Sequence, residues 1–412
     1  MPWTNGFASI GTGARESQES TCSAVPASEK RAIRSAVVIV GGGVMGSSVA
    51  WNLTRDPNFA GTVTVIERDP TYARASSALS ASSIRQQFST PLNIHLSRYG
   101  IGFLRRAAGV LGVDLGLKER GYLFLASAAG EAVLRANNAV QRAEKCAVEL
   151  LDPAALRARF PSLSAAGVAL ASHGTANEGW FDGPALMQGF RRKARELGVA
   201  YIADEVVGLE PNAVTLRSGT RMEADTIVIA AGPWSGEVAA LAGIALPVEP
   251  RRRSVFVFDC REALPMLPLT IDPSGVWFRP EGRFYLGGTT PAEGNDPAGA
   301  PLEVQHQEWD DMVWPVLAQR VPAFEAAKVV NAWAGYYEYN TFDQNGVVGR
   351  HPDLESIVFA TGFSGHGIQQ SPAVGRAVAE LIVHGSYRTI DLLPFAYERI
   401  SAGRPMRELN VV

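Results

Sequence analysis

The sequence has few cysteines, no long apolar run and no excess of charge of one sign. Its three cysteines, Cys22, Cys146 and Cys260, are an odd number without CxxC spacing, so they suggest neither a disulfide framework nor a zinc site. No stretch reaches the roughly 18 apolar residues of a membrane span. The 38 basic and 41 acidic residues leave a net charge of −3, which argues against a nucleic-acid binder. We therefore expect a cytoplasmic protein with a small-molecule or cofactor-sized partner, no metal and no membrane span.

The length predicts more than one structural unit. A chain of 412 residues exceeds the size at which one hydrophobic core usually keeps growing, so two domains or two interleaved domains are expected. Residues 1–35 are rich in Ser, Thr, Ala and Gly without apolar periodicity, which predicts a flexible extension. Scattered arginines leave an organelle transit peptide as the alternative, although three glutamates in the same segment oppose it.

A nucleotide-binding pattern opens the ordered part of the chain. The β-branched run at 36–40 leads directly into Gly41-Gly-Gly-Val-Met-Gly46, which is GxGxxG after a buried strand. A helix is predicted over 44–53 and a second strand over 62–66, which ends at Glu67, 21 residues past Gly46. This complete β-α-β unit predicts dinucleotide binding, and FAD and NAD both remain open at this point.

Each residue of this unit has its own task. Gly41 permits the tight turn, Gly43 lets a pyrophosphate approach the backbone, and Gly46 allows the helix to pack closely on the strand. The helix N-terminus faces the phosphates, and the Glu67 carboxylate is placed to bind ribose hydroxyls. The Ser- and Ala-rich stretch at 75–87 either lines the pyrophosphate or is a solvated loop.

A second glycine-rich loop lies near the C-terminus. The strand that begins at Ile357 is followed by Gly362-Phe-Ser-Gly-His-Gly367, and Ser371 and Pro372 are predicted as N-cap and first residue of a helix running to about residue 384. Loop amides and a helix N-terminus can stabilise the negative charge of a reduced flavin, which favours FAD over NAD. His366 stands out in this loop, but a lone histidine is more often structural than catalytic.

The motifs together resemble a known group of flavoproteins. The unit at 41–67, Ala231-Gly-Pro-Trp234 and the loop at 362–367 resemble the D-amino-acid oxidase superfamily, especially sarcosine oxidase and dimethylglycine dehydrogenase. The stretches at 83–88, 363–371 and 389–395 resemble still more the mitochondrial FAD-dependent oxidoreductase-domain proteins linked to respiratory complex I assembly, and their bacterial relatives. The resemblance covers about residues 36–402.

The resemblance implies an α/β fold in which a Rossmann-like FAD-binding domain is interleaved with an α+β substrate domain containing a mixed or antiparallel sheet. The implied FAD-binding segments are about 36–118, 178–246 and 334–402. Residues 119–177 and 247–333 would form the substrate domain, with 403–412 as a C-terminal tail.

The resemblance also implies which residues contact the cofactor. The residues that match FAD contacts are Gly41, Gly43, Val44, Met45, Gly46, Glu67, Arg68, Ser76, Ser77, Val207, Gly232, Gly365, His366, Gly367 and Ile368. The flavin-linking residues of covalent relatives fall near Gly335 and within Ser80–Ser82, so FAD is expected to be non-covalent.

Four further residues are expected at the substrate. Arg85 matches the arginine that grips a substrate carboxylate, and its forked guanidinium suits that task, although a surface salt bridge is the alternative. Tyr285 falls where an oxygen-activating lysine stands in sarcosine oxidases, so the electron acceptor is O2 or another molecule. Gln369 replaces a second carboxylate-binding lysine, and Tyr337 completes the polar pocket.

The implied reaction is oxidation of a secondary amine or N-substituted amino acid. Hydride passes from the carbon beside nitrogen to the flavin N5, and the imine then hydrolyses. Because the family lysine is missing, an alternative remains: a flavin-stabilised assembly or interaction protein related to complex I assembly factors, without amine turnover.

Overall fold

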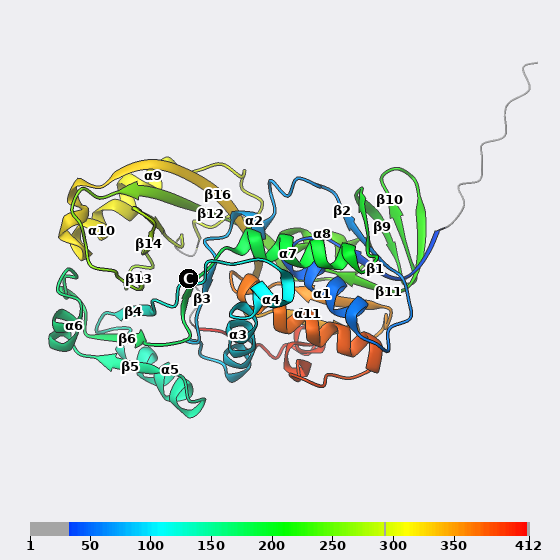
Figure 1. The fold of residues 1–412 in the computed structure, drawn as a ribbon, viewed down its shortest axis with the longest axis horizontal. Helices are drawn as coiled ribbons and strands as arrows, with labels where there is room; N and C mark the ends of the chain where they lie inside the picture. Colours follow the sequence, from blue (N-terminus) through cyan, green and yellow to red (C-terminus); the bar gives the residue numbers. More distant parts are fainter. Residues whose placement is uncertain (1–32, 292–293, 410–412) are drawn as a thin grey trace, which may run out of the picture. The chain divides into compact units, whose positions relative to one another are not determined.

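The computed structural model describes residues 33–291 and 294–409, so the predicted N-terminal extension falls almost wholly outside the described residues. The predicted β-α-β unit is confirmed as β1 (Ile33–Val40), α1 (Val44–Arg55) and β2 (Val63–Glu67). The two strands pair in parallel with Val37 opposite Val63, so the glycine turn lies at the carboxyl end of β1 (Figure 1).

A mixed sheet of eight strands is built around this unit. Its order is β17-β18-β11-β1-β2-β8, and β10 pairs with β11 and with β9. The remaining strands are β8 (Ala200–Ala203), β9 (Val206–Glu210), β10 (Ala213–Leu216), β11 (Arg221–Ile229), β17 (Val347–Arg350) and β18 (Ile357–Thr361). Val37 and Ile39 pack into one core and Val38 and Val40 into another. Burial on both faces explains why β1 is a continuous apolar run.

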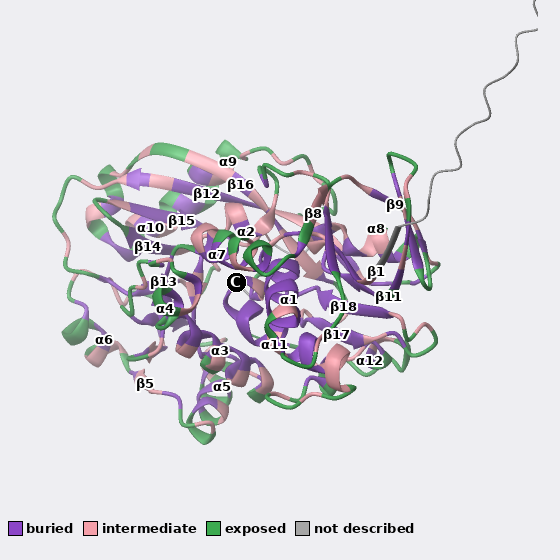
Figure 2. Ribbon diagram, turned by 45° about the vertical axis from the view of Figure 1, so that its right-hand side comes forward, coloured by how far each residue is buried: buried purple, intermediate pink, exposed green. Residues whose placement is uncertain are grey.

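Helices cover one face of this sheet. They include α1, α3 (Pro91–Leu104), α4 (Ala107–Leu111), α7 (Gly183–Glu196) and α11 (Gly367–His384). Most residues of helices α1 and α11 are buried, as Figure 2 shows. Smaller elements are α2 (Ser76–Leu79), α8 (Ser235–Ala240), α12 (Glu398–Ser401), and the 3-10 turns η1 (Gly232–Trp234) and η4 (Leu393–Phe395).

Helix α11 corrects one prediction, because it begins at Gly367 and contains Pro372 in its interior. A proline lacks the N–H that would bond the Ile368 carbonyl, and its presence normally ends or begins a helix. Here the Ser371 hydroxyl donates to that carbonyl at 2.9 Å. The Ser-Pro pair therefore continues the helix, and the helix N-terminus lies five residues before the predicted one.

The second large sheet is also mixed. Its order is β16-β12-β15-β14-β13-β4-β6-β5, with β4 and β13 parallel and the other neighbours antiparallel. Its strands are β4 (Tyr122–Ala126), β5 (Val148–Leu151), β6 (Leu170–Gly174), β12 (Val248–Asp259), β13 (Leu269–Ile271), β14 (Trp277–Glu281), β15 (Phe284–Gly288) and β16 (Lys328–Asn340). A Rossmann-like sheet combined with a second mixed sheet confirms the predicted fold class.

Short helices accompany this second sheet. They are α5 (Glu131–Ala143), α6 (Pro153–Arg159), α9 (His306–Glu308), the π-helical turn η2 (Trp309–Val313), α10 (Trp314–Arg320) and the 3-10 turn η3 (Pro322–Ala326). A two-stranded pair joins β3 (Ser83–Ile84) and β7 (Gly179–Trp180). Within the described ranges no helix combines the length and apolarity needed to cross a membrane.

The chain passes more than once between the two large sheets. Strand β16 belongs wholly to the second sheet, although the predicted boundary at 334 would cut it in two. It pairs with β12 along most of its length, from Lys328 opposite Asp259 to Asn340 opposite Val248. This long pairing, rather than composition, determines where the chain leaves the second sheet for the first.

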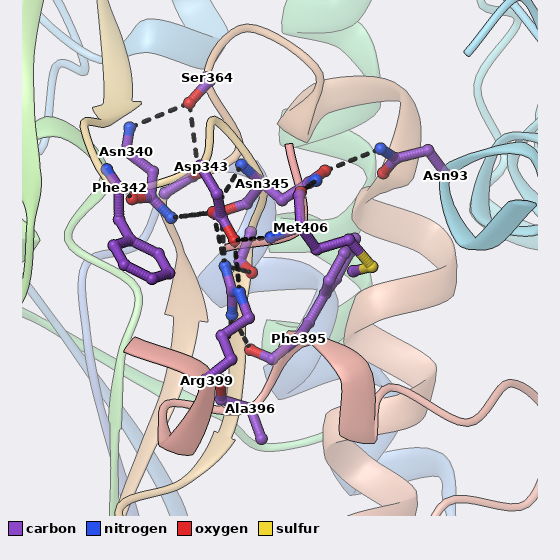
Figure 3. A network of polar contacts seen from close by, with 12 residues as sticks. Asn93, Asn340, Phe342, Asp343, Asn345, Ser364, Phe395, Ala396, Arg399 and Met406 are labelled. Atoms are coloured by element: carbon purple, nitrogen blue, oxygen red, sulfur yellow. Dashed lines mark hydrogen bonds and ion pairs between the residues drawn. The ribbon is translucent and has the colours of Figure 1, made fainter. Parts of the chain in front are cut away.

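The predicted C-terminal tail packs against the body of the protein. Glu408 is 1% exposed, and the Met406 amide donates to Asp343 at 3.1 Å. Asp343 is also the centre of a buried ion pair with Arg399, at 2.7 Å and 3.0 Å (Figure 3). The same network reaches the glycine-rich loop, because the Ser364 hydroxyl accepts a hydrogen bond from the Asn340 amide at 2.9 Å.

Candidate cofactor and substrate site

A cavity of about 710 Å³ has walls from both sheets. One end is lined by the glycine turn after β1, by the end of β2 and by the residues that follow β11. The other end is lined by β12, β16 and the residues around the start of α11. The predicted residues on its wall are Gly41, Gly43, Val44, Met45, Glu67, Arg68, Ser76, Ser77, Val207, Gly232, Tyr337, Gly365, Gly367 and Ile368.

The glycine turn leaves no room for side chains. Gly41 has φ +101°, and a Cβ there would lie 2.3 Å from the Ala230 carbonyl oxygen. A Cβ at Gly46 would lie 1.9 Å from the Gly41 oxygen, which agrees with the predicted close packing of α1 on the turn. Gly43 is the N-cap and supplies no side-chain cap, so the start of α1 is open to a ligand with negative charge.

Glu67 is fixed at the end of β2 by two backbone donors. Its Oε2 accepts from the Gly42 amide at 2.8 Å, and its Oε1 accepts from the Asp69 amide at 2.9 Å. Burial raises the pKa of Glu67, and these two amide hydrogen bonds partly oppose that rise. The carboxyl group thus stands on the cavity wall in a single orientation, as a ribose-binding acid requires.

Polar groups on the neighbouring wall are placed where they can bind a ligand. The Arg68 guanidinium lies over the Trp234 ring, 3.8 Å from its centroid. The buried Ser76 hydroxyl has no hydrogen-bond partner among the described residues, although a buried hydroxyl normally has one. Ser77 accepts from the Val44 amide at 3.2 Å, at the start of α1. An orphaned hydroxyl beside the start of a helix fits a diphosphate-bearing cofactor.

The opposite end of the cavity combines a tyrosine, an arginine and a carboxyl group. Gly365 has φ +93°, and a Cβ there would lie 2.6 Å from the Tyr337 ring. The Arg253 guanidinium carbon lies 5.0 Å from the Tyr337 ring centroid and pairs with both Asp296 oxygens at 2.8 and 2.9 Å. Burial raises the pKa of Tyr337, so its hydroxyl is neutral at physiological pH. Glu338 follows on the same wall.

Tyr285 corrects a prediction. Its ring stacks on Phe258 at 5.5 Å and meets Phe324 at 4.8 Å, inside the apolar cluster of the second sheet. Tyr285 lies directly opposite Phe258 in the β12-β15 register, and paired residues point to the same face of a sheet. It therefore faces the apolar core and not the cavity, so it is not a pocket polar group.

Three other predicted residues lie away from the cavity wall, taken over the described chain. Gln369 uses its amide oxygen to accept from the Arg85 amide at 2.9 Å and from the Ser97 hydroxyl at 3.0 Å. The Arg85 guanidinium lies 4.1 Å from the Phe88 ring centroid and donates to the Gln87 carbonyl. The His366 ring meets the Phe88 ring edge-on, with 5.1 Å between the two centroids.

These residues form a buried support around Phe88 rather than a substrate pocket. Burial, and then the positive charge of Arg85, hold the pKa of His366 well below its ordinary value, so the ring is neutral. This favours the structural interpretation of His366. Arg85 does not lie on the cavity wall, so its position does not support the predicted contact with a substrate carboxylate.

Sequence reasoning missed several wall residues, among them Arg74, Trp277, Thr289, Arg253 and Glu338. Arg253 is the third of three consecutive arginines in β12, and such a charged run inside a strand is a usable signal. Glu338 carries no comparable signal, because it is one acid in an aromatic strand whose pairing is set by distant residues.

The chain is similar to known proteins over most of its length. The family model "DAO: FAD dependent oxidoreductase" matches residues 36–381. The chain belongs to this family. It is 45% identical to the FAD-dependent oxidoreductase domain-containing protein 1 of Xenopus laevis, over 92% of this chain and 85% of that protein. It is 27% identical to a glycine oxidase of Geobacillus kaustophilus, over 88% of this chain and 96% of that protein.

Solved structures share the fold. An L-proline dehydrogenase from P. horikoshii has a TM-score of 0.79 and 25% identity, over 91% of this chain and 100% of that one. FAD is thus the cofactor of the family, and the wall residues fit it. Glu67 would hold the ribose, Gly43 and the start of α1 the diphosphate, and the wall formed by Tyr337, Gly365, Gly367 and Ile368 the flavin.

Proposed function

We propose that this protein oxidises a secondary amine or an N-substituted amino acid at the carbon beside nitrogen. Bound FAD supplies the acceptor for the two electrons and the hydrogen. Among the relatives, glycine oxidase acts on an amino acid and L-proline dehydrogenase on a cyclic secondary amine, which supports this substrate class. The observation that carries the proposal is the cavity end walled by Tyr337 and Arg253, beside the loop that starts α11.

Arg253 is the proposed anchor for an acidic group of the substrate. Its side chain is 8% exposed and lies on the cavity wall, whereas Arg85 does not. Its Nε is buried and has no partner among the described residues, while its two terminal nitrogens bond Asp296. A substrate carboxylate would share this guanidinium with Asp296, so Asp296 limits how tightly an acidic substrate is held.

The remaining roles are positional. The neutral Tyr337 hydroxyl can orient the amine, and the Trp277 and Tyr336 rings bound the apolar part of the pocket. Hydride loss from a neutral amine needs no strong general base, and water hydrolyses the resulting imine after it leaves the cavity. Non-covalent FAD is part of the proposal. The positions where covalent relatives have flavin-linking residues are on the cavity wall, but here they are Gly335 and Ser80–Ser82, which are not such linking residues.

The test is anaerobic bleaching of the flavin band near about 450 nm by a panel of N-methyl, N-carboxyalkyl and cyclic amino acids. At least one class should bleach the protein, and the rate of recolouring in air then separates an oxidase from a dehydrogenase. In Arg253→Lys the half-saturating concentration of an acidic amine should rise about tenfold or more, because a forked charge-assisted contact is lost.

Arg252→Lys is the matched control. Arg252 is the neighbouring residue on the same strand, but it contacts the Pro301 carbonyl and does not line the cavity in the described part of the chain. It should behave as wild type. Absence of bleaching by the whole panel, with FAD bound, would contradict the proposal and favour the assembly or interaction role.

A further inference from the structure

Glu338 is a buried carboxyl group on the cavity wall that amine oxidation, as proposed above, does not use. It lies on β16 next to Tyr337. Its Oε2 accepts from the Thr361 hydroxyl at 3.1 Å and from the Gly362 amide at 3.2 Å. A Cβ on Gly367 would lie 2.8 Å from its Oε1. One carboxyl oxygen is therefore held by the loop after β18, and the other lies against the first residue of α11.

The position places a titratable group at a helix N-terminus that also lines the cavity. Helix α11 has 18 residues, and its N-terminus carries roughly half a positive charge. The N-cap residue His366 provides no side-chain cap. An ionised Glu338 offsets this positive end, and a protonated Glu338 leaves it unopposed. The field at this end of the cavity thus depends on one proton.

The surroundings of Glu338 place the change between its ionised and protonated forms near neutral pH. Burial raises the pKa of Glu338 to about 7, and the hydrogen bonds from Gly362 and Thr361 oppose the rise. The Thr361 hydroxyl also lies 2.7 Å from the Ser235 hydroxyl and 3.4 Å from the Gly232 carbonyl oxygen, so three acceptors compete for its single proton. A carboxyl group with this balance changes its charge when a nearby charge changes.

Other charged and titratable side chains face Glu338 from the elements packed against it, taken over the described residues. The short elements α2 and η1, which also contact β16, carry no ionisable side chain. Arg251 pairs with Glu249 at 2.7 Å and Arg253 with Asp296 at 2.8 Å. The pKa of His366 is far below neutral, and burial raises that of Tyr337. The groups on the adjoining elements are Tyr337, Tyr339, Glu249, Arg251, Arg253 and His366.

We propose that Glu338 is a positioning residue that couples proton uptake to reduction of the bound FAD. The carboxylate is ionised while the cofactor is oxidised, and it binds one proton from solvent when two electrons enter the cavity. Linkage makes the effect reciprocal: if reduction favours the proton, ionisation of Glu338 disfavours reduction by the same factor. This role needs bound FAD but does not need amine turnover, so it can fail or hold independently of the proposed substrate.

The test measures the reduction potential of the holoprotein with a chemical reductant and indicator dyes over roughly pH 6 to 9. Above about pH 7 the wild-type potential should fall more steeply than that of Glu338→Gln. The extra slope is one proton per two electrons, about 30 mV per pH unit. At the alkaline end Glu338→Gln should have the higher potential. Equal slopes and equal potentials in the two proteins would overturn the proposal.

Two more variants make the result specific. Glu237→Gln removes an exposed acid from the same cavity wall and should keep the wild-type slope. Thr361→Val preserves volume but removes the hydroxyl donor, so the steep region should move to higher pH, because the ionised form loses a hydrogen bond. If Glu338→Gln does not retain FAD, Thr361→Val decides: an unmoved steep region would overturn the coupling.

Discussion

Gly46 shows how a single missing side chain positions the cofactor-binding helix. The 1.9 Å distance from its imagined Cβ to the Gly41 oxygen involves backbone, so no rotation of a side chain can relieve it. Helix α1 would have to move away from the turn between β1 and α1. Because the same turn lines the cavity, such a shift also displaces the amides that face the diphosphate.

We therefore expect Gly46→Ala to weaken FAD binding by at least about tenfold, since overpacking a tight contact costs on the order of 1–3 kcal/mol. Titration of the apoprotein with FAD measures this. Gly102→Ala is the control, because a Cβ at Gly102, in α3, meets nothing within 4 Å. That variant should bind FAD as wild type and gain up to about 1 kcal/mol in stability. Unchanged FAD affinity in Gly46→Ala would contradict the argument.

The glycine positions were predictable because their spacing encodes contacts within one β-α-β unit. Tyr285 and Arg85 were not, because their surroundings depend on distant pairing. Tyr285 faces the core through its register with Phe258, and Arg85 is held by Gln369, which is far along the chain. Arg253 and Glu338 reach the cavity only because β12 and β16 pair along their length. Spacing in one segment cannot supply such information.

At the scale of elements, the C-terminal segment at 403–409 acts as a fixed part of the fold. Glu408 accepts hydrogen bonds from the Ser89 amide at 2.7 Å, from the Thr90 hydroxyl at 3.0 Å and from the Asn93 side chain at 3.0 Å. Burial raises the pKa of Glu408, but the charge of Arg85 and the Ser89 amide outweigh it, so the net pKa is lowered. The segment thereby attaches to the start of α3.

Glu408→Ala should lower the free energy of unfolding by about 3–5 kcal/mol, because several buried donors and the charge of Arg85 lose their acceptor. Urea unfolding of the holoprotein at neutral pH measures the loss. The lowered pKa means that this stabilisation is present above the ordinary glutamate pKa and is lost as the pH falls through the folded-state value. The difference between variant and wild type should therefore shrink in acid.

Glu355→Ala serves as the control, since Glu355 is an exposed acid near the end of the same half of the chain. It should unfold within about 0.5 kcal/mol of wild type. If both variants unfold alike, the C-terminal segment has no structural role.

The start of α11 shows why local sequence patterns can mislead at this scale. Ser371-Pro372 has the local signature of a helix N-terminus, yet one hydroxyl-to-carbonyl bond continues the helix through it.

At the scale of the whole molecule, the cavity is the place where both sheets meet a single ligand. Its walls include residues of β1, β2 and β9 from the first sheet and of β12 and β16 from the second. Bound FAD therefore adds contacts that neither sheet makes by itself. The fold class was predictable from the order of motifs, because each motif is local, but the shared walls could not be predicted without the strand pairing.

Removal of FAD should destabilise the protein in proportion to its affinity. A ligand at a free concentration one hundred times its Kd stabilises the folded state by about 2.7 kcal/mol. Thermal unfolding of the apoprotein, with and without added FAD, should show a Tm that rises with FAD concentration. NAD at equal concentration should leave the Tm unchanged. A Tm independent of FAD would show that the cavity does not hold the cofactor.

The strand order of the first sheet also has a consequence for folding of the chain during its synthesis. Strand β1 lies beside β11, and β11 lies beside β18, which ends at Thr361. The nucleotide-binding turn emerges early in synthesis, yet the neighbour of β1 on one side, β11, is complete only at residue 229 of 412, and the neighbour of β11 only at Thr361. Until then the apolar edge of β1 has no partner and is prone to aggregation. Newly made chains should therefore depend on chaperones more than the order of their motifs suggests.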